Sequence, residues 1–126
     1  MDSYDVSLIG ASSAQNKAIA RQWCAENNPN DLSVDGKWFD DLPLHKRRWV
    51  PYNGGVSDEQ LAWLSAVLQI AKDAGEEVVV FSHQPVHSPS KPQSLVWNAE
   101  QVLSVLHAAG NVRMWIAGHD HDGQCE

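Results

Sequence analysis

Three histidines occupy positions that suit a metal site. His119 and His121 follow an apolar segment, residues 112–117, and lie two residues apart. Side chains two apart in an extended segment point to the same side, so both rings would face one place. His83 follows a second apolar segment, residues 77–82. Because histidine is the commonest metal-binding side chain, we expect these three residues to be metal ligands.

The segments before these histidines must bring them together. Residues 77–82 form a continuous β-branched run, which is typical of a strand covered on both faces. Between Asn98, which can cap a helix, and Gly110, which can end one, apolar residues recur at helical spacing and predict a helix. Residues 112–117 then predict a second strand. This order predicts a βαβ unit with a right-handed crossover. The two strands would be parallel neighbours about 4.8 Å apart, ending at one edge of the sheet.

Weaker patterns predict three further elements. Residues 4–10 alternate as a strand does, and a serine at 12 or 13 can cap a helix that runs to about residue 26. Ser57 and Gln60 form a capping box, in which each side chain bonds the other residue's backbone. The helix that follows is amphipathic and closes near residue 75.

The segment 27–55 carries repeated loop signals, and such a long irregular segment is often functional. It contains the basic cluster 45–48, which is either a solvated charge run or a phosphate contact. His45, His87 and His107 lack the placement of the other three histidines, so we expect each to be an exposed residue or a local hydrogen-bond partner. Asp120 and Asp122 either orient the imidazoles or belong to a solvated turn.

Composition excludes several classes of function. A net charge of −7 argues against a nucleic-acid partner, since phosphate binding needs clustered Lys and Arg. No apolar segment approaches the roughly 20 residues that span a bilayer, and the amino terminus does not resemble a signal peptide. We therefore expect a cytoplasmic protein with no membrane partner, in which Cys24 and Cys125 are reduced thiols. A serine hydrolase would need a G-x-S-x-G elbow, which the sequence lacks.

The motifs Ser82-His83-Gln84-Pro85 and Gly118-His119-Asp120-His121 resemble the last two motifs of the calcineurin-like metallophosphoesterases. Within that superfamily, the sequences of residues 52–64, 95–98 and 117–123 look like the manganese-dependent ADP-ribose/CDP-alcohol diphosphatases. The resemblance is strong over about residues 50–123 and loose over 1–49. It implies a partial metallophosphoesterase α/β sandwich, with a mixed sheet, βαβ units and flanking helices, in one domain over residues 1–126.

The resemblance also implies a site with two metal ions. His83 and His119 match ligands of one ion, and His121 matches a ligand of the other. The family implies manganese, although imidazole ligands suit zinc or iron equally well. The implied substrate is a small molecule linked to a nucleoside diphosphate, with Asn53, Trp97 and Asn98 as candidate substrate-binding residues.

The chain departs from the family pattern in its first half. It has no D-x-H and no G-D, and Gly110-Asn111 is followed by Val rather than by the His of G-N-H. The proton-donating His of that motif has no counterpart, so no catalytic residue is assigned. We therefore expect Met1 to begin midway through the family's domain and the chain alone to be weakly active or inactive.

Two alternatives from other classes stay open. The chain could be a non-catalytic metal-binding or assembly module whose missing N-terminal half comes from another polypeptide. It could also be a mononuclear zinc hydrolase with three histidine ligands and an open fourth position.

Overall fold

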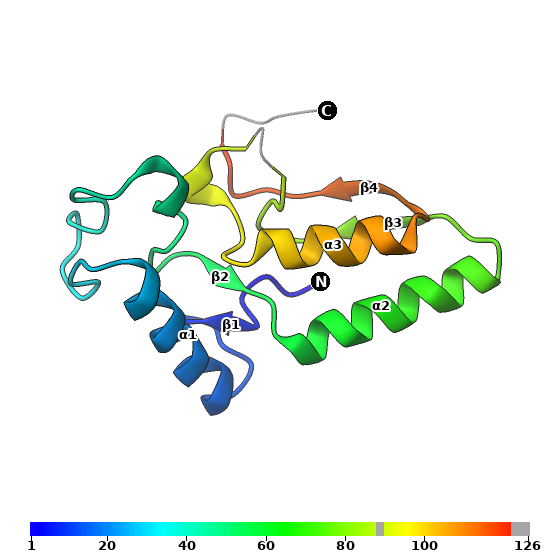
Figure 1. The fold of residues 1–126 in the computed structure, drawn as a ribbon, viewed down its shortest axis with the longest axis horizontal. Helices are drawn as coiled ribbons and strands as arrows, with labels where there is room; N and C mark the ends of the chain where they lie inside the picture. Colours follow the sequence, from blue (N-terminus) through cyan, green and yellow to red (C-terminus); the bar gives the residue numbers. More distant parts are fainter. Residues whose placement is uncertain (88–89, 122–126) are drawn as a thin grey trace.

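The protein is described by a computed structural model that covers residues 1–87 and 90–121 (Figure 1). Along the chain, its elements are β1 Val6–Ser7, α1 Ala14–Asn27, η1 Leu44–Lys46, β2 Gly54–Gly55, α2 Asp58–Asp73, β3 Val78–Phe81, η2 Pro92–Ser94, α3 Ala99–Ala109 and β4 Val112–Ile116. The η elements are short 3-10 helices. No helix in the described ranges is both long and apolar enough to cross a membrane.

The unit that carries the histidines is β3–α3–β4. β3 and β4 pair in parallel, with Val80 opposite Trp115 and Phe81 opposite Ile116. α3 makes the crossover between them, and α2 packs alongside α3 (Figure 1). Buried side chains of both helices and of Val80 form one core. The predicted α/β class and the βαβ unit are confirmed.

The prediction that these strands are covered on both faces is wrong for the described residues. Val80 lies in the core, but its neighbours along the strand, Val79 and Phe81, are 47% and 63% exposed. On β4, Met114 and Ile116 are 55% and 41% exposed. The reason is that α2 and α3 pack in the same core as Val80, which leaves the alternate side chains uncovered. We call these four exposed side chains the outer face of the β3–β4 sheet.

A second, smaller unit contains β1, β2 and α1. β1 and β2 pair antiparallel, with Val6 opposite Gly55. Among the described residues, the strands therefore form two separate sheets rather than one mixed sheet. β1 is shorter than the predicted strand 4–10. Val6, Cys24 and Trp97 lie in the core of this unit. Cys24 is a free thiol, as expected, while Cys125 lies outside the described residues.

The helix starts agree with the predicted caps in position, and α2 and α3 differ from the prediction in part of their hydrogen bonding. Ser13 accepts a hydrogen bond from the Asn16 backbone N–H, as an N-cap should. Ser57 caps α2 in the same way, but the Ser57 N–H donates to Asp5 rather than to Gln60. Half of the predicted capping box is therefore replaced by a long-range contact. Asn98 holds the N-cap position of α3 without a side-chain cap bond.

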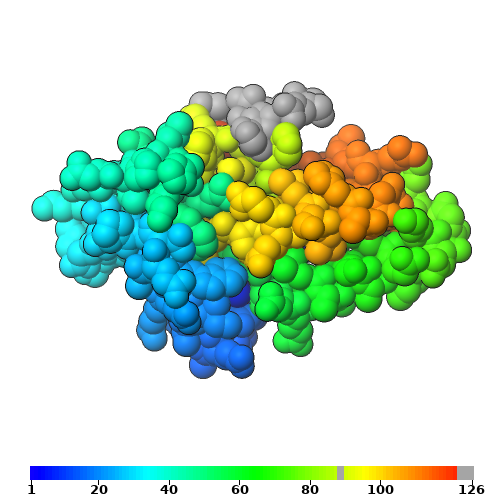
Figure 2. Space-filling view, viewed as in Figure 1, coloured from blue at the N-terminus to red at the C-terminus, as the bar shows by residue number. Residues whose placement is uncertain are grey.

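The long loop that follows α1 is organised by asparagine side chains. The Asn28 amide donates to the carbonyls of Trp38 and Trp49, and the Asn30 amide donates to Trp38 and Asp40. Figure 2 shows this segment, in cyan to blue-green, at one end of the molecule, opposite the end formed by α2 and α3. The loop therefore has a defined path, which leads to β2 and to the residues just before it.

Candidate metal centre

The structure brings two of the three predicted histidines together. His83 follows β3 and His119 follows β4 by three residues, so both lie at the carboxyl edge of the parallel pair. The His83 Nε2 and His119 Nδ1 atoms are 3.0 Å apart, and the two rings meet edge to face. The Gly118 N–H donates to the His83 carbonyl, which ties the two loops together at this point.

The backbone at His119 takes an uncommon conformation. Its φ of 64° lies in the left-handed region, which few residues other than glycine adopt. Such conformations persist where surrounding contacts hold them and are frequent at functional sites. The ring of Tyr52 lies 5.8 Å from the His119 ring, and Tyr4 stacks on His83. The two imidazoles are thus held by aromatic neighbours from the other unit of the fold.

Asn53 is the third polar group at this place. Its Oδ1 lies 2.8 Å from His119 Nε2, on the side of the ring away from His83. Its amide nitrogen donates to the carbonyls of Arg48 and Gln93. Asn53 is fully buried and is joined to His119 across 66 positions of sequence.

Burial lowers the pKa of His119, and the neighbouring His83 and His121 lower it further, while Asp120 opposes them. The shift favours the neutral form of the His119 ring. A neutral imidazole is the form that binds a metal ion, because binding needs a bare ring nitrogen. The electrostatics of the site therefore suit a metal ligand.

A pocket of about 340 Å³ opens beside His119. It is also lined by His121, so the third predicted ligand faces the same space. Lys91 and Asp120 lie on its wall, and the Lys91 backbone N–H donates to the Asp120 carboxylate. Asp120 thus holds the loop of Lys91 in place, whereas Asp122 lies outside the described residues. The volume is at the low end of the range for small-molecule sites, about 300–1,000 Å³.

The geometry fits a metal ion in part. Two nitrogens bonded to one ion at about 2.1 Å can be at most about 4.2 Å apart, and the 3.0 Å between His83 and His119 satisfies this limit. Within residues 1–87 and 90–121, however, no three His, Cys, Asp or Glu side chains gather closely enough to hold an ion. The expected meeting of three imidazoles is therefore seen for two of them, and the mononuclear three-histidine alternative gains no support.

The candidate substrate-binding residues are buried and have internal contacts. Trp97 packs against Trp49, with ring centroids 5.7 Å apart. The Asn98 side chain bonds both backbone groups of Val56. Asn53 is bonded as described above. These internal contacts show that each of the three residues supports the structure around the site. That they also contact a substrate stays a prediction.

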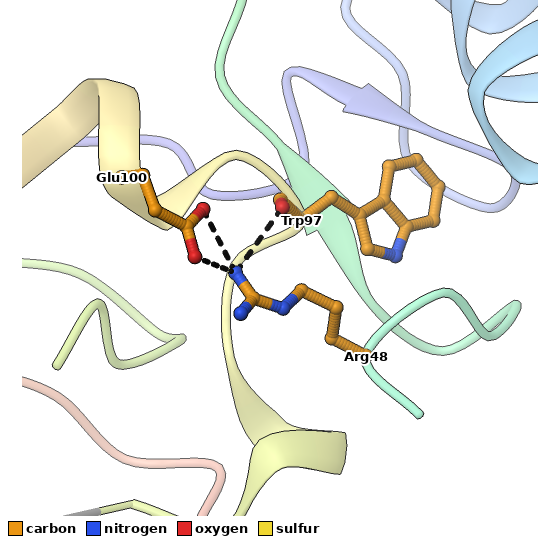
Figure 3. A network of polar contacts seen from close by, with 3 residues as sticks. All are labelled: Arg48, Trp97 and Glu100. Carbon is orange, nitrogen blue, oxygen red and sulfur yellow. Dashed lines mark hydrogen bonds and ion pairs between the residues drawn. The ribbon is translucent and has the colours of Figure 1, made fainter. Parts of the chain in front are cut away.

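The basic cluster contributes an ion pair to this architecture. Arg48 donates to both carboxylate oxygens of Glu100 at 2.8 and 3.0 Å, and to the Trp97 carbonyl at 3.5 Å (Figure 3). Arg47 instead lies over the Phe39 ring. Arg48 therefore fixes the loop before Asn53 to the start of α3, a role that neither expectation for the cluster had included.

Sequence reasoning missed Tyr52 and Gln93 as neighbours of the site. Each lines the pocket, and Gln93 also accepts a hydrogen bond from Asn53. Both lie in loops whose path depends on contacts distant in sequence. For Tyr52 the local signal was the long irregular segment before β2, which indicated function without indicating a residue.

Comparison with known families and structures agrees with this geometry. The model of the calcineurin-like phosphoesterase family matches residues 13–123. Curated relatives named manganese-dependent ADP-ribose/CDP-alcohol diphosphatase are 40% identical in Danio rerio, 36% in Arabidopsis thaliana and 34% in Homo sapiens, each over 98% of this chain. The aligned region is 38%, 39% and 35% of those proteins, so the chain spans about two-fifths of the length of its relatives.

A solved structure has the same fold over the same region. The crystal structure of a dimetal phosphatase from Danio rerio superposes with a TM-score of 0.83 at 40% identity. The superposition covers 98% of this chain and 40% of that one.

Proposed function

The chain belongs to the calcineurin-like phosphoesterase family. We propose that it forms part of a metal-dependent phosphoesterase site, to which it contributes His83, His119 and His121 as metal ligands. The observation that carries this proposal is the 3.0 Å approach of His83 Nε2 to His119 Nδ1 at the carboxyl edge of β3 and β4. His121 lines the pocket beside them and is the proposed ligand of a second ion.

The proposed cofactor is a pair of divalent ions, with manganese favoured by the names of the relatives. Such ions supply positive charge to a phosphoryl group and acidify the water that attacks it. The chain's own residues hold the imidazoles in place, through Asn53 and the aromatic neighbours, and shape the pocket.

The proposed substrate class is a small molecule linked to a nucleoside diphosphate. The relatives are named for ADP-ribose and CDP-alcohols, which share a diphosphate bridge. The pocket offers Lys91 as a cationic residue and Gln93 and Ser94 as polar residues on its wall. Because the chain has a net charge of −7, an anionic substrate needs such local positive charge, from ions or from lysine.

We propose that the 126-residue chain by itself binds divalent ions weakly and hydrolyses little. The family's D-x-H and G-D motifs, which supply the bridging carboxylate, do not occur in this sequence. The chain offers an ion only the His83 and His119 imidazoles, with His121 nearby, as proposed ligands. An ion with so few protein ligands should bind weakly.

The test is a titration of the purified chain with Mn²⁺ by calorimetry, together with an assay of ADP-ribose hydrolysis. We expect weak binding in the wild type and a further loss of at least about tenfold in His83→Ala, because the variant lacks one proposed ligand. His107→Ala removes an exposed histidine from the last turn of α3 and should bind like the wild type. Equal binding by all three proteins would contradict the proposed ligands. Turnover at ordinary enzymatic rates, of order 10 per second, would contradict the proposed low activity.

A second candidate function is assembly with another polypeptide that carries the remaining motifs of the domain. The observation that favours it is the outer face of the β3–β4 sheet, where four large apolar side chains are exposed side by side. Contiguous apolar surface of this kind commonly marks an interaction site.

A further inference from the structure

The hydrogen bonds of Asn53 determine which way its amide group points. Its Nδ2 lies 2.8 Å from the Arg48 carbonyl oxygen and 2.7 Å from the Gln93 carbonyl oxygen. Carbonyl oxygens only accept hydrogen bonds, so the atom facing both of them must be the NH₂ group. The other amide atom, Oδ1, therefore faces His119 Nε2 at 2.8 Å.

This orientation has a consequence for His119. An amide oxygen only accepts, so the hydrogen between Asn53 and His119 must be carried by Nε2 of the ring. A neutral imidazole has one N–H, which leaves Nδ1 bare. Nδ1 is also the atom that faces His83 at 3.0 Å.

We propose that Asn53 is a positioning residue that holds His119 in the tautomer whose bare Nδ1 is directed at the metal position. The inference rests on the proposed function, since it assigns a role within the same site. The role predicted for Asn53 from the sequence was substrate contact rather than orientation of a metal ligand. Both of its N–H groups are used by backbone carbonyls, and its side chain is fully buried.

The contacts around Asn53 explain how the position is kept rigid. Arg48, whose carbonyl accepts from Asn53, is held through its side chain by Glu100 on α3 (Figure 3). Gln93, the other acceptor, lies on the wall of the pocket. Asn53 thus joins two loops to the ligand that follows β4. Groups that orient metal-bound histidines in this way typically change metal affinity by about 10–100-fold when removed.

The first experiment reads the tautomer of metal-free protein by two-bond ¹H–¹⁵N NMR of the histidine rings at about pH 8, which is above the ordinary pKa of histidine, about 6.5. We expect His119 to carry its hydrogen on Nε2. The 3.0 Å contact then requires His83 to carry a hydrogen on Nε2 as well, because His119 Nδ1 can only accept. A hydrogen found mainly on His119 Nδ1 would overturn the proposal, whether or not any variant folds.

The second experiment compares two substitutions that remove the same two N–H groups. Asn53→Asp retains an oxygen that accepts from His119, so the Nε2–H tautomer should persist. Asn53→Leu has a similar shape without an acceptor, so the Nδ1–H form should increase. Asn111→Asp is the matched control, since the Asn111 amide also donates to two backbone carbonyls, those of Leu68 and Glu76, away from the site. Asn111→Asp should lose stability for the same reason as the Asn53 variants. In this control, however, the tautomer of His119 should not change.

Metal titration completes the test. We expect Mn²⁺ affinity to fall about 10–100-fold in Asn53→Leu and to change little in Asn111→Asp. Equal tautomers and equal affinities in Asn53→Leu and the wild type would overturn the positioning role. If the wild type bound no Mn²⁺ at all, the proposed function would fail, and the tautomer of the metal-free protein would still decide the role of Asn53.

Discussion

Asp5 is a buried carboxylate on which three elements depend. It accepts hydrogen bonds from Ser12 and Asn16 at the start of α1, and from Ser57 and Gln60 at the start of α2. Burial raises its pKa, but the hydrogen bonds from Ser12, Ser57 and Gln60 together outweigh this effect, and its pKa is lowered below 3.8. The ionised carboxylate therefore stabilises the junction of β1, α1 and α2.

The pH dependence of stability follows from this shift. A lowered pKa in the folded state means that the stabilisation is complete above the unfolded pKa, about 3.9, and is lost as the pH falls through the folded value. Asp5→Asn replaces a carboxylate oxygen with an NH₂ group, which would face donors, so it should lower the free energy of unfolding by about 1–3 kcal/mol at pH 7. It should also remove part of the stability loss below about pH 4.

Urea unfolding between about pH 3 and pH 7 measures both effects, since this range extends from neutral pH to below the unfolded carboxyl pKa of about 3.9. Asp35→Asn, in the exposed part of the loop after α1, is the control and should follow the wild type. Parallel stability curves for Asp5→Asn and the wild type across this range would show that the carboxylate has no such role.

At the scale of elements, a two-residue strand sets the position of the site. β2 consists of Gly54 and Gly55, directly after Asn53. A Cβ atom at Gly54 would overlap the Ser3 carbonyl oxygen, and one at Gly55 would lie 2.8 Å from the Trp23 ring. The close approach of β1 to β2 therefore requires glycine, and the same approach places Asn53 against His119.

Gly54→Ala should destabilise the fold by about 1–3 kcal/mol, because the backbone must move to relieve the overlap. Gly10→Ala is the matched control, since its Cβ would make ordinary contact with Tyr4 at 3.4 Å. Its stability should change by less than about 1 kcal/mol. Chemical denaturation of the three proteins gives the comparison, and an equal effect at both positions would contradict the packing argument.

At the scale of the whole molecule, apolar surface is distributed unevenly. The inner face of the β3–β4 sheet packs in the core with α2 and α3, while Val79, Phe81, Met114 and Ile116 are exposed on its outer face. The chain spans about two-fifths of the length of its relatives, so the assembly hypothesis gives this face a specific partner, a polypeptide with the family's remaining motifs.

The assembly hypothesis is tested by mixing this chain with the remaining part of the Danio rerio relative and measuring binding and hydrolysis of ADP-ribose. Phe81→Lys should weaken binding at least about tenfold, since burying a phenylalanine contributes about 1.5–3 kcal/mol. Ile9→Lys replaces an equally exposed apolar residue away from the sheet and should bind like the wild type. Binding that is unaffected by Phe81→Lys would exclude the outer face as the interface.

Local patterns in the sequence were sufficient to predict the helices and strands nearest the histidines. Helical spacing and caps predicted α2 and α3, and the two apolar runs predicted parallel strands that end in His83 and His119. These features depend on neighbours within a few residues, so a single sequence contains them. The motifs at the strand ends likewise indicated the family, which the match over residues 13–123 confirmed.

Tertiary structure alone decided the contacts that complete the site. The bond between Asn53 and His119 joins residues 66 positions apart, and the Arg48–Glu100 pair joins residues 52 apart. The outer face of the sheet looked like a buried one in sequence, because a continuous apolar run does not say which side a helix covers. Side-chain chemistry at one position is local, but its partner depends on how the whole chain packs, and that is why these features required the structure.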